Sequence, residues 1–220
     1  MITHIGLNID GVLLKDTFSP VLKAVFEKLG FDYTPEIERQ LFSQNQNKAA
    51  GFIQEKYKLS LSKEELIALY FKERNQYLNS VGNMINAGVD SLLSFLKTLK
   101  VSVFSYGGLP EDYFKKEMGE FYPYFAEYIC TNDFRPGLKE IIRDVYKTEA
   151  RSVLFVDDVN TVAETAKCLN CPFIGIPSTP FQRADMIKTG VKHILDSVSQ
   201  INLQLLNEIE KEIADERIWQ

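Results

Sequence analysis

The sequence has few residues of the kinds that mark secreted, membrane-spanning or nucleic-acid-binding proteins. It contains three cysteines and two histidines among 220 residues, and its formal charge at pH 7 is -5. Lys and Arg form no basic run, so nucleic acid is not expected as a partner. No apolar segment reaches the roughly 20 residues that a membrane span needs, and no secretory leader is recognisable. We therefore expect a cytoplasmic protein that makes no membrane contact.

The cysteines and histidines are too few and too scattered for a zinc site. An odd number of cysteines is typical of free thiols in a reducing compartment. Cys168 and Cys171 form a C-x-x-C motif, but a structural zinc site needs about four ligands and no second Cys or His pair is present. His4 and His193 each stand beside apolar residues, and we expect them to pack or to form surface hydrogen bonds.

The hydrophobic pattern divides the chain into an α/β part and a helical insertion. A short apolar strand at 2–7 runs into the acidic turn 8–11. From about 17 to 82 the pattern predicts four helices and no strand. After Gly88 short apolar strands alternate with amphipathic helices, which favours parallel strands joined by right-handed crossovers. The predicted strands of this part are 101–104, 128–130, 152–156 and 173–176, and the predicted helices are one around 89–96, then 137–147, 159–169, 181–188 and about 197–217.

These elements predict a fold of the α/β class, a three-layer, Rossmann-like parallel sheet with an inserted helical bundle. We assign residues 1–16 and 83–220 to the α/β core and residues 17–82 to a four-helix cap. We expect an apolar stripe on the last helix to dock on the body of the protein, with a homodimer contact as the alternative. The stripe consists of Ile201, Leu205, Leu206, Ile209 and Ile213.

Polar residues stand at four points next to the buried segments. Asn8 and Asp10 follow the first strand, and the residues 105–108 follow the second. Arg135-Pro136 precedes the helix at 137, and the acidic pair 157–158 ends the strand at 152–156. Ligands of open parallel sheets bind outside the carboxyl ends of the strands, so we expect the four points to converge on one edge.

The residue types at this edge suit a phosphate group beside a magnesium ion. Magnesium prefers a near-octahedral set of oxygens that includes one or two carboxylates, which Asp157 and Asp158 supply. Arg135 offers a fixed positive charge and a planar fork of donors that matches phosphate. Ser105 adds a hydroxyl, and the glycines at 107–108 let backbone N–H groups come close to an anion.

The four segments resemble the four motifs of the haloacid dehalogenase (HAD) superfamily. The resemblance is to the phosphatase and phosphoglucomutase-like branch, which has a helical cap after the first motif. The family's first motif is D-x-D-G-[TV], and residues 8–12 read NIDGV. A buried strand that ends at Ser105 is similar to the second motif, Arg135-Pro136 to the third, and the acidic pair 157–158 to the fourth. The resemblance covers nearly the whole chain, up to about residue 200.

The resemblance implies a Mg²⁺-dependent hydrolase that acts on a small phosphorylated metabolite through an aspartyl-phosphate. It places Asn8 in the position of the nucleophile and Asp10 in that of the general acid and base. In the cap, Asn47 and Lys48 are the expected contacts with the leaving portion of the substrate. The implied phosphate-binding residues are Ser105, Tyr106, Gly107 and Arg135, and the implied metal ligands are Asn8, Asp10, Asp157 and Asp158.

Asn8 departs from the family's pattern at the attacking position. A neutral amide oxygen is a poor nucleophile and a weaker magnesium ligand than a carboxylate, so turnover is expected to fall by about 10⁴ to 10⁶. Three explanations stay open: an engineered Asp-to-Asn change, a natural loss of the nucleophile, and slow deamidation, which the bulky Ile9 disfavours. Val162 is a second departure, because relatives often carry Asn or Asp there.

The sequence therefore predicts a phosphate-monoester phosphatase whose turnover is impaired. The alternative is a non-catalytic pseudoenzyme that binds a phosphate ligand or a partner protein, and an exposed stripe at 201–213 would favour the partner protein. A haloacid dehalogenase would also need an attacking Asp but would not need Asp10 as a proton donor. The retained Asp10 therefore favours phosphate chemistry.

Overall fold

The computed structural model describes residues 1–219, and the chain forms two compact units. One unit consists of residues 1–15 together with the chain from residue 85 onward, and the other consists of residues 16–84. The chain crosses between the units at 15–16 and at 84–85. These crossings lie within two residues of the boundaries drawn from the sequence pattern. A role for the second unit as a substrate cap stays a prediction.

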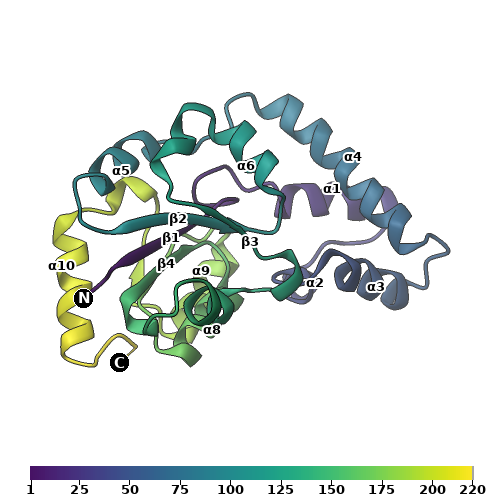
Figure 1. Ribbon diagram of the computed structural model, residues 1–220. Coiled ribbons are helices and arrows are strands. Elements are labelled where there is room, and N and C mark those ends of the chain that lie inside the picture. Colours follow the sequence, from purple (N-terminus) through teal and green to yellow (C-terminus); the bar gives the residue numbers. More distant parts are fainter. Residues whose placement is uncertain (220) are drawn as a thin grey trace. The chain divides into compact units, whose positions relative to one another are not determined.

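The first unit is built on a six-stranded parallel sheet with the order β3-β2-β1-β4-β5-β6. Helices cover both of its faces (Figure 1). The predicted fold class, a Rossmann-like parallel sheet with an inserted helical bundle, is confirmed. The strands are β1 (His4–Asn8), β2 (Ser102–Gly107), β3 (Tyr128–Cys130), β4 (Val153–Asp157), β5 (Phe173–Gly175) and β6 (His193–Ile194).

The central strands are buried along most of their length because both faces of the sheet are covered. Every residue of β4 is buried, and in β1 the three middle residues are buried. A strand buried on both faces reads as a continuous apolar run rather than as an alternating one. This pattern allowed five of the six strands to be predicted to within three residues at each end, whereas the two-residue strand β6 was not predicted from it.

The register of the sheet decides which face each side chain occupies. Leu7 of β1 pairs with Ser105 of β2 and with Val156 of β4, and Asn8 pairs with Tyr106. Residues that pair across parallel strands point to the same face, and their chain neighbours point to the opposite one. Asn8, Tyr106 and Asp157 therefore share one face at the carboxyl edge, and Ser105 points to the other.

The helices of the sheet unit follow the predicted order with two differences. The helix α6 was not predicted, because only Phe114 and Met118 form its buried stripe. The short helix α7 continues as one π-helical turn at Ile141–Val145. The α-helices are α5 (Val89–Leu96), α6 (Glu111–Met118), α7 (Leu138–Glu140), α8 (Asn160–Leu169), α9 (Pro180–Thr189) and α10 (Leu203–Ala214).

The last helix, α10, docks on its own chain. Its side chains Leu206, Ile209 and Ile213 are buried, and the carboxylate of Glu210 accepts a hydrogen bond from the backbone N–H of Ile2. The helix lies near the N-terminus of the chain (Figure 1). The apolar stripe is thus used within the molecule, and the structure gives no support to a homodimer through this helix.

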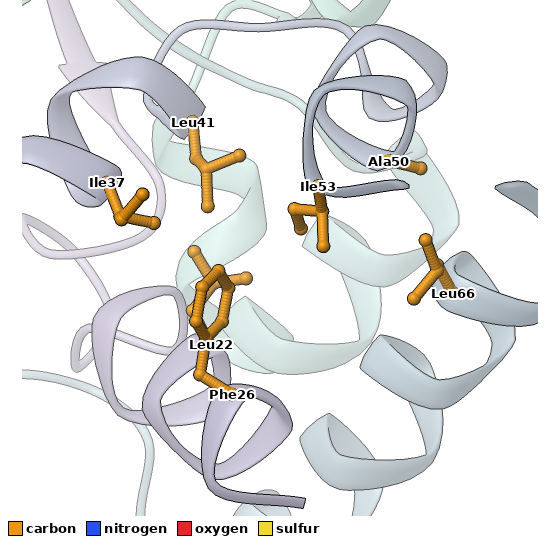
Figure 2. Packing of buried hydrophobic residues seen from close by; sticks show 7 residues of the cluster. All are labelled: Leu22, Phe26, Ile37, Leu41, Ala50, Ile53 and Leu66. Atoms are coloured by element: carbon orange, nitrogen blue, oxygen red, sulfur yellow. The ribbon is translucent and has the colours of Figure 1, made fainter. Parts of the chain in front are cut away.

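The second unit is a bundle of four helices with its own apolar core. Thr34, Asn45 and Ser62 each accept a hydrogen bond from a backbone N–H of the first turn of the helix that follows. All four helices contribute to the core, which Figure 2 shows from close by. The helices are α1 (Ser19–Leu29), α2 (Pro35–Leu41), α3 (Gln46–Tyr57) and α4 (Lys63–Val81), and the core residues are Leu22, Phe26, Ile37, Leu41, Ala50, Ile53 and Leu66.

Two further features bear on the classes of protein considered above. Among residues 1–219, no helix combines the length and the apolar character needed to cross a membrane. The three cysteines are free: Cys130 and Cys168 are exposed and Cys171 is buried. Burial raises the pKa of the Cys171 thiol to about 12, so this thiol stays protonated at neutral pH.

Asn86 fixes the segment through which the chain leaves β1. Its side-chain amide donates hydrogen bonds of 2.9 Å to the carbonyl oxygens of Val12 and of Leu14. Its backbone N–H donates to the carbonyl of Leu13, and a bridge joins Leu14 to Ile85. One side chain thus holds the turn after β1 against the returning chain.

Asn86→Ala is expected to lower the free energy of unfolding by about 1 to 3 kcal/mol, because buried carbonyl groups lose their donor. Denaturant unfolding followed by circular dichroism measures this loss. The matched control is Asn83→Ala, three residues earlier at an exposed position. Equal effects of the two substitutions would contradict the proposed role of Asn86.

Candidate active site

The candidate site begins with Asn8, the last residue of β1. Asn8 is half-buried at the carboxyl edge of the sheet, and its side-chain Nδ2 lies 2.9 Å from Oδ2 of Asp157 at the end of β4. The strand order runs in opposite directions on the two sides of β1, so this is a topological switch point of the sheet. The first and the fourth predicted points therefore meet.

The carboxylate of Asp157 is fully buried and receives three hydrogen bonds. Its Oδ2 accepts from the hydroxyl of Tyr106 at 2.7 Å as well as from Asn8, and its Oδ1 accepts from the backbone N–H of Val159 at 2.9 Å. Burial raises the pKa of Asp157 to about 6, although these hydrogen bonds and the charge of Arg135 act in the opposite direction. The carboxylate is thus held within the protein rather than presented to solvent.

Tyr106 is the third member of this cluster. It is 1% exposed, and its ring packs edge-on against Phe155 at a centroid distance of 5.6 Å. Burial and the negative charges of Asp157 and Asp158 raise its pKa well above its usual value, so the hydroxyl keeps its proton and acts as a donor. The resemblance implies that Tyr106 binds phosphate; in the structure its hydroxyl donates to Asp157.

Ser105 does not take part in the cluster. It is fully buried in the middle of β2, and its hydroxyl donates to the carbonyl of Leu7 at 2.9 Å. The expectation that Ser105 offers its hydroxyl to an anion is therefore not supported. The strand ends three residues beyond the predicted strand 101–104, and the register turns Ser105 to the opposite face.

The turn after β1 brings Asp158 against Gly11. Gly11 has a φ of 82°, and a Cβ atom built on it would stand 2.2 Å from the carboxyl carbon of Asp158. Asp158 is buried, and its Oδ2 accepts a hydrogen bond of 2.6 Å from Ser178. Asp10, one residue before Gly11, is half-buried. The turn can approach Asp158 this closely only because residue 11 has no side chain.

Arg135 reaches the same edge from the loop after β3. Its Nη1 donates to the hydroxyl of Thr131 at 3.2 Å, and it stands 3.3 Å from the place of a Cβ atom on Gly108. The positive charge of Arg135 lowers the pKa of both Asp157 and Tyr106, so it lies within electrostatic reach of both. The structure thus brings Arg135 together with the ends of β1, β2 and β4.

Gly107 serves packing rather than an open anion site. It is buried, and a Cβ atom there would stand 2.3 Å from the side chain of Ile9. Its carbonyl accepts from the backbone N–H of Thr131 at 2.7 Å. Gly108, by contrast, is half-exposed and faces the Arg135 guanidinium. Of the two glycines, only Gly108 is placed to let an anion approach the backbone beside Arg135.

Several supporting residues were not found from the sequence. Val162 is buried in α8, and the start of that helix is held by Gln182, whose Oε1 accepts from the backbone N–H of Asn160 at 2.8 Å. Ser178 and Thr131 hold Asp158 and Arg135. Gln182, Ser178 and Thr131 come from segments without a recognised motif, and only the fold brings them to the site.

Comparison with known proteins shows which solved structures this chain resembles. No protein-family model matches the sequence, and no curated protein sequence matches it either. Solved structures do match over nearly the whole chain. A β-phosphoglucomutase from Clostridium difficile is 17% identical, with a TM-score of 0.72, over 98% of this chain and 100% of that protein. A haloacid dehalogenase-like hydrolase from Bacteroides fragilis is 14% identical, with a TM-score of 0.66, over 91% and 99% of the two chains.

The chain has the haloacid dehalogenase fold. A third match with this fold is a variant of CbbY from Rhodobacter sphaeroides in complex with xylulose 1,5-bisphosphate. It is 13% identical, with a TM-score of 0.68, over 92% of this chain and 97% of that protein. The resemblance seen in the four sequence segments is thus confirmed in three dimensions, and at these identities the likeness concerns the fold.

The haloacid dehalogenase fold implies a magnesium ion, and the donors at this edge do not fit one. Both oxygens of Asp157 already accept hydrogen bonds from protein donors, and Asn8 turns an N–H group toward this carboxylate. Within the described part of the chain, no group of three or more His, Cys, Asp or Glu side chains is placed to hold a metal ion. In the predicted ligand set of Asn8, Asp10, Asp157 and Asp158, both oxygens of Asp157 thus already accept hydrogen bonds, and Asn8 presents an N–H group rather than its oxygen on that side.

The two residues that are predicted to contact a substrate from the cap lie in the helical unit. Asn47 and Lys48 stand in the first turn of α3, where the side chain of Asn45 accepts from the backbone N–H of Asn47 at 2.9 Å. A contact of Asn47 or Lys48 with a substrate stays a prediction.

Proposed function

We propose that this chain is a phosphatase-type protein whose hydrolytic turnover is impaired and which binds a small phosphorylated molecule without cleaving it. The observation that carries the proposal is Asn8, which occupies the expected attacking position and uses its amide as a hydrogen-bond donor to Asp157. The protein would bind its phosphorylated ligand, without catalysis, at a site that resembles that of a hydrolase. A resident Mg²⁺ is not part of it.

The chemistry of the amide supports the loss of turnover. A covalent phosphoryl transfer needs an electron-rich oxygen aimed at phosphorus, and an amide oxygen supplies little nucleophilic density. The Asn8 amide is also fixed by its bond to Asp157, which directs the N–H side toward the other acidic groups. Asp10 has the carboxyl group of a general acid, but a general acid without an attacking group completes no transfer.

The groups around Arg135 support the binding of a phosphate ester. Arg135 is half-buried, and its guanidinium offers a planar fork of donors. Because Gly108 has no side chain, an anion can approach this guanidinium past the backbone of residue 108. Asp157 and Asp158 are both buried and hydrogen-bonded, so their charges are partly neutralised by protein donors. The CbbY variant named above carries Asn in place of one Asp and was solved with a bisphosphorylated sugar, so a variant of this kind in this fold can hold a phosphate ester.

The other functions fit the structure less well. A partner protein on the apolar stripe of α10 is disfavoured because Leu206, Ile209 and Ile213 are buried in the chain itself. A haloacid dehalogenase needs the same nucleophile that Asn8 replaces. A haloacid dehalogenase would also not need Asp10 as a proton donor.

Isothermal titration of the protein with inorganic phosphate and with a sugar phosphate tests the proposal. We expect saturable binding near about 1 mM and a ten- to hundredfold loss of affinity in Arg135→Gln, because a charge-assisted hydrogen bond contributes about 1.5 to 3 kcal/mol. Arg143→Gln is the matched control, since that exposed guanidinium pairs with its neighbour Asp144.

The same preparation should hydrolyse p-nitrophenyl phosphate no faster than buffer. Saturable turnover that survives a second chromatographic step would overturn the proposal. So would the absence of heat at millimolar phosphate, or equal affinities in Arg135→Gln and Arg143→Gln.

A further inference from the structure

The Asp157 carboxylate has nearly all of its acceptor capacity filled by three protein donors. A carboxylate offers about four lone-pair positions. Oδ2 accepts from Tyr106 and Asn8, and Oδ1 accepts from the backbone N–H of Val159. One position is left, on a group that is 0% exposed. A cation that bound here would have to displace a hydrogen bond inside the protein.

We infer that the Asn8 amide and the Tyr106 hydroxyl take the place of a cation on the Asp157 carboxylate, so that the pocket works without resident Mg²⁺. The inference deepens the proposed function, because it describes how the same pocket is balanced electrostatically. It concerns what binds to the acidic groups, whereas the proposed function concerns what binds to Arg135.

The direction of the Asn8 amide follows from its partner. With Nδ2 toward Oδ2 of Asp157, the pair forms a hydrogen bond of 2.9 Å. With the amide rotated by half a turn, its oxygen would face the carboxylate oxygen and the two would repel. Asn8 therefore cannot offer its oxygen to a cation on the Asp157 side without leaving that contact.

The packing of the Tyr106 ring keeps its hydroxyl on the Asp157 carboxylate. Its ring is 1% exposed and is held between Phe104 and Phe155, so the hydroxyl has little freedom to turn away. The hydroxyl stands 2.7 Å from Oδ2 of Asp157, shorter than the bond from Asn8. A phenol is a donor at neutral pH, and the surroundings of this one strengthen its hold on the proton.

The second acid of the pair is also engaged. Asp158 accepts from Ser178 at 2.6 Å and lies against the Gly11 turn. Asn8 and Tyr106 are therefore two donors to one carboxylate, from two strands that pair directly.

Titration with MgCl₂ of the parent protein and of the double variant Asn8→Asp/Tyr106→Phe tests the inference. The parent should give no saturable heat up to about 10 mM, whereas the double variant should bind with a Kd at or below about 0.1 mM. At about 10 mM MgCl₂ the Tm of the double variant should then rise by about 5 °C, and that of the parent should not change. Phe keeps the buried ring of Tyr106, and near-UV circular dichroism verifies that the variant is folded.

Saturable binding of Mg²⁺ by the parent overturns the inference whatever the variant does. A folded double variant that binds no Mg²⁺ also overturns it, because Asn8 and Tyr106 would then not be what excludes the cation. If the double variant does not fold, Tyr106→Phe alone replaces it and should bind Mg²⁺ at least about tenfold more tightly than the parent; no difference overturns the inference. Phosphate titration of the parent in EDTA tests the proposed function separately, so a failure of either claim can be recognised.

Discussion

Asn8→Asp combined with Tyr106→Phe is expected to raise the Mg²⁺-dependent hydrolysis of p-nitrophenyl phosphate by at least about 10³-fold over the parent. Asn8→Asp alone is expected to raise it by less than about tenfold. Initial rates in MgCl₂ and in EDTA give both values. The comparison separates the loss of the nucleophile from the loss of the cation.

The physical reason is the charge that the single substitution creates. A carboxylate at residue 8 would stand about as close to Asp157 as the amide does now, 2.9 Å in the present structure. Two carboxylates at hydrogen-bond distance without a cation cannot both ionise, so one of them takes up a proton and loses nucleophilicity. While Tyr106 still donates to Asp157, a cation that would relieve this repulsion could bind that buried carboxylate only by displacing a hydrogen bond.

Tyr122→Phe in the Asn8→Asp background is the matched control. Tyr122 also donates its hydroxyl to a carboxylate, that of Glu111, but on an exposed surface. It should leave the rate of Asn8→Asp unchanged. If Asn8→Asp alone recovered the full rate, Tyr106 would not be an obstacle to turnover.

Gly11→Ala is expected to destabilise the protein by about 3 kcal/mol, the largest effect of a single methyl group in this account. Two costs add up. A positive φ of 82° is unfavourable for Ala, and the new Cβ atom would overlap the Asp158 carboxyl group at 2.2 Å. Guanidinium unfolding followed by fluorescence and by circular dichroism measures the loss.

Gly30→Ala separates the two costs. Gly30 has a similar φ of 78°, but a Cβ atom there would meet nothing within 4 Å, so about 1 kcal/mol is expected. In an Asp158→Ala background the effect of Gly11→Ala should fall to the same level. An undiminished effect in that background would mean that Asp158 does not lie against the turn.

The strands and their carboxyl edges could be predicted from the sequence because their signals are local. The run 153–156 in β4 is apolar throughout, and a strand buried on both faces leaves that pattern. The acidic turn after β1 and the acidic pair after β4 could therefore be placed at one edge before any contact was known. Helix α6 lacks such a signal, since most of its residues are polar and its buried stripe is two residues wide.

The contacts inside the site could not be predicted, because they depend on register. Ser105 and Tyr106 are neighbours in the sequence, and a shift of one residue exchanges their faces. The sequence pattern ended β2 too early and gave the hydroxyl role to Ser105. The hydrogen bond from Tyr106 to Asp157 spans 51 positions in the chain and has no local signature.

A crystal soaked in MnCl₂ tests the central claim most directly, since Mn²⁺ takes the same oxygen ligands as Mg²⁺ and is visible by its anomalous scattering. The account predicts no anomalous peak beside Asp157, with the Tyr106 hydroxyl and the Asn8 amide still on its carboxylate. A peak within coordination distance of Asp157 and Asp158, with the Tyr106 hydroxyl turned away, would contradict it.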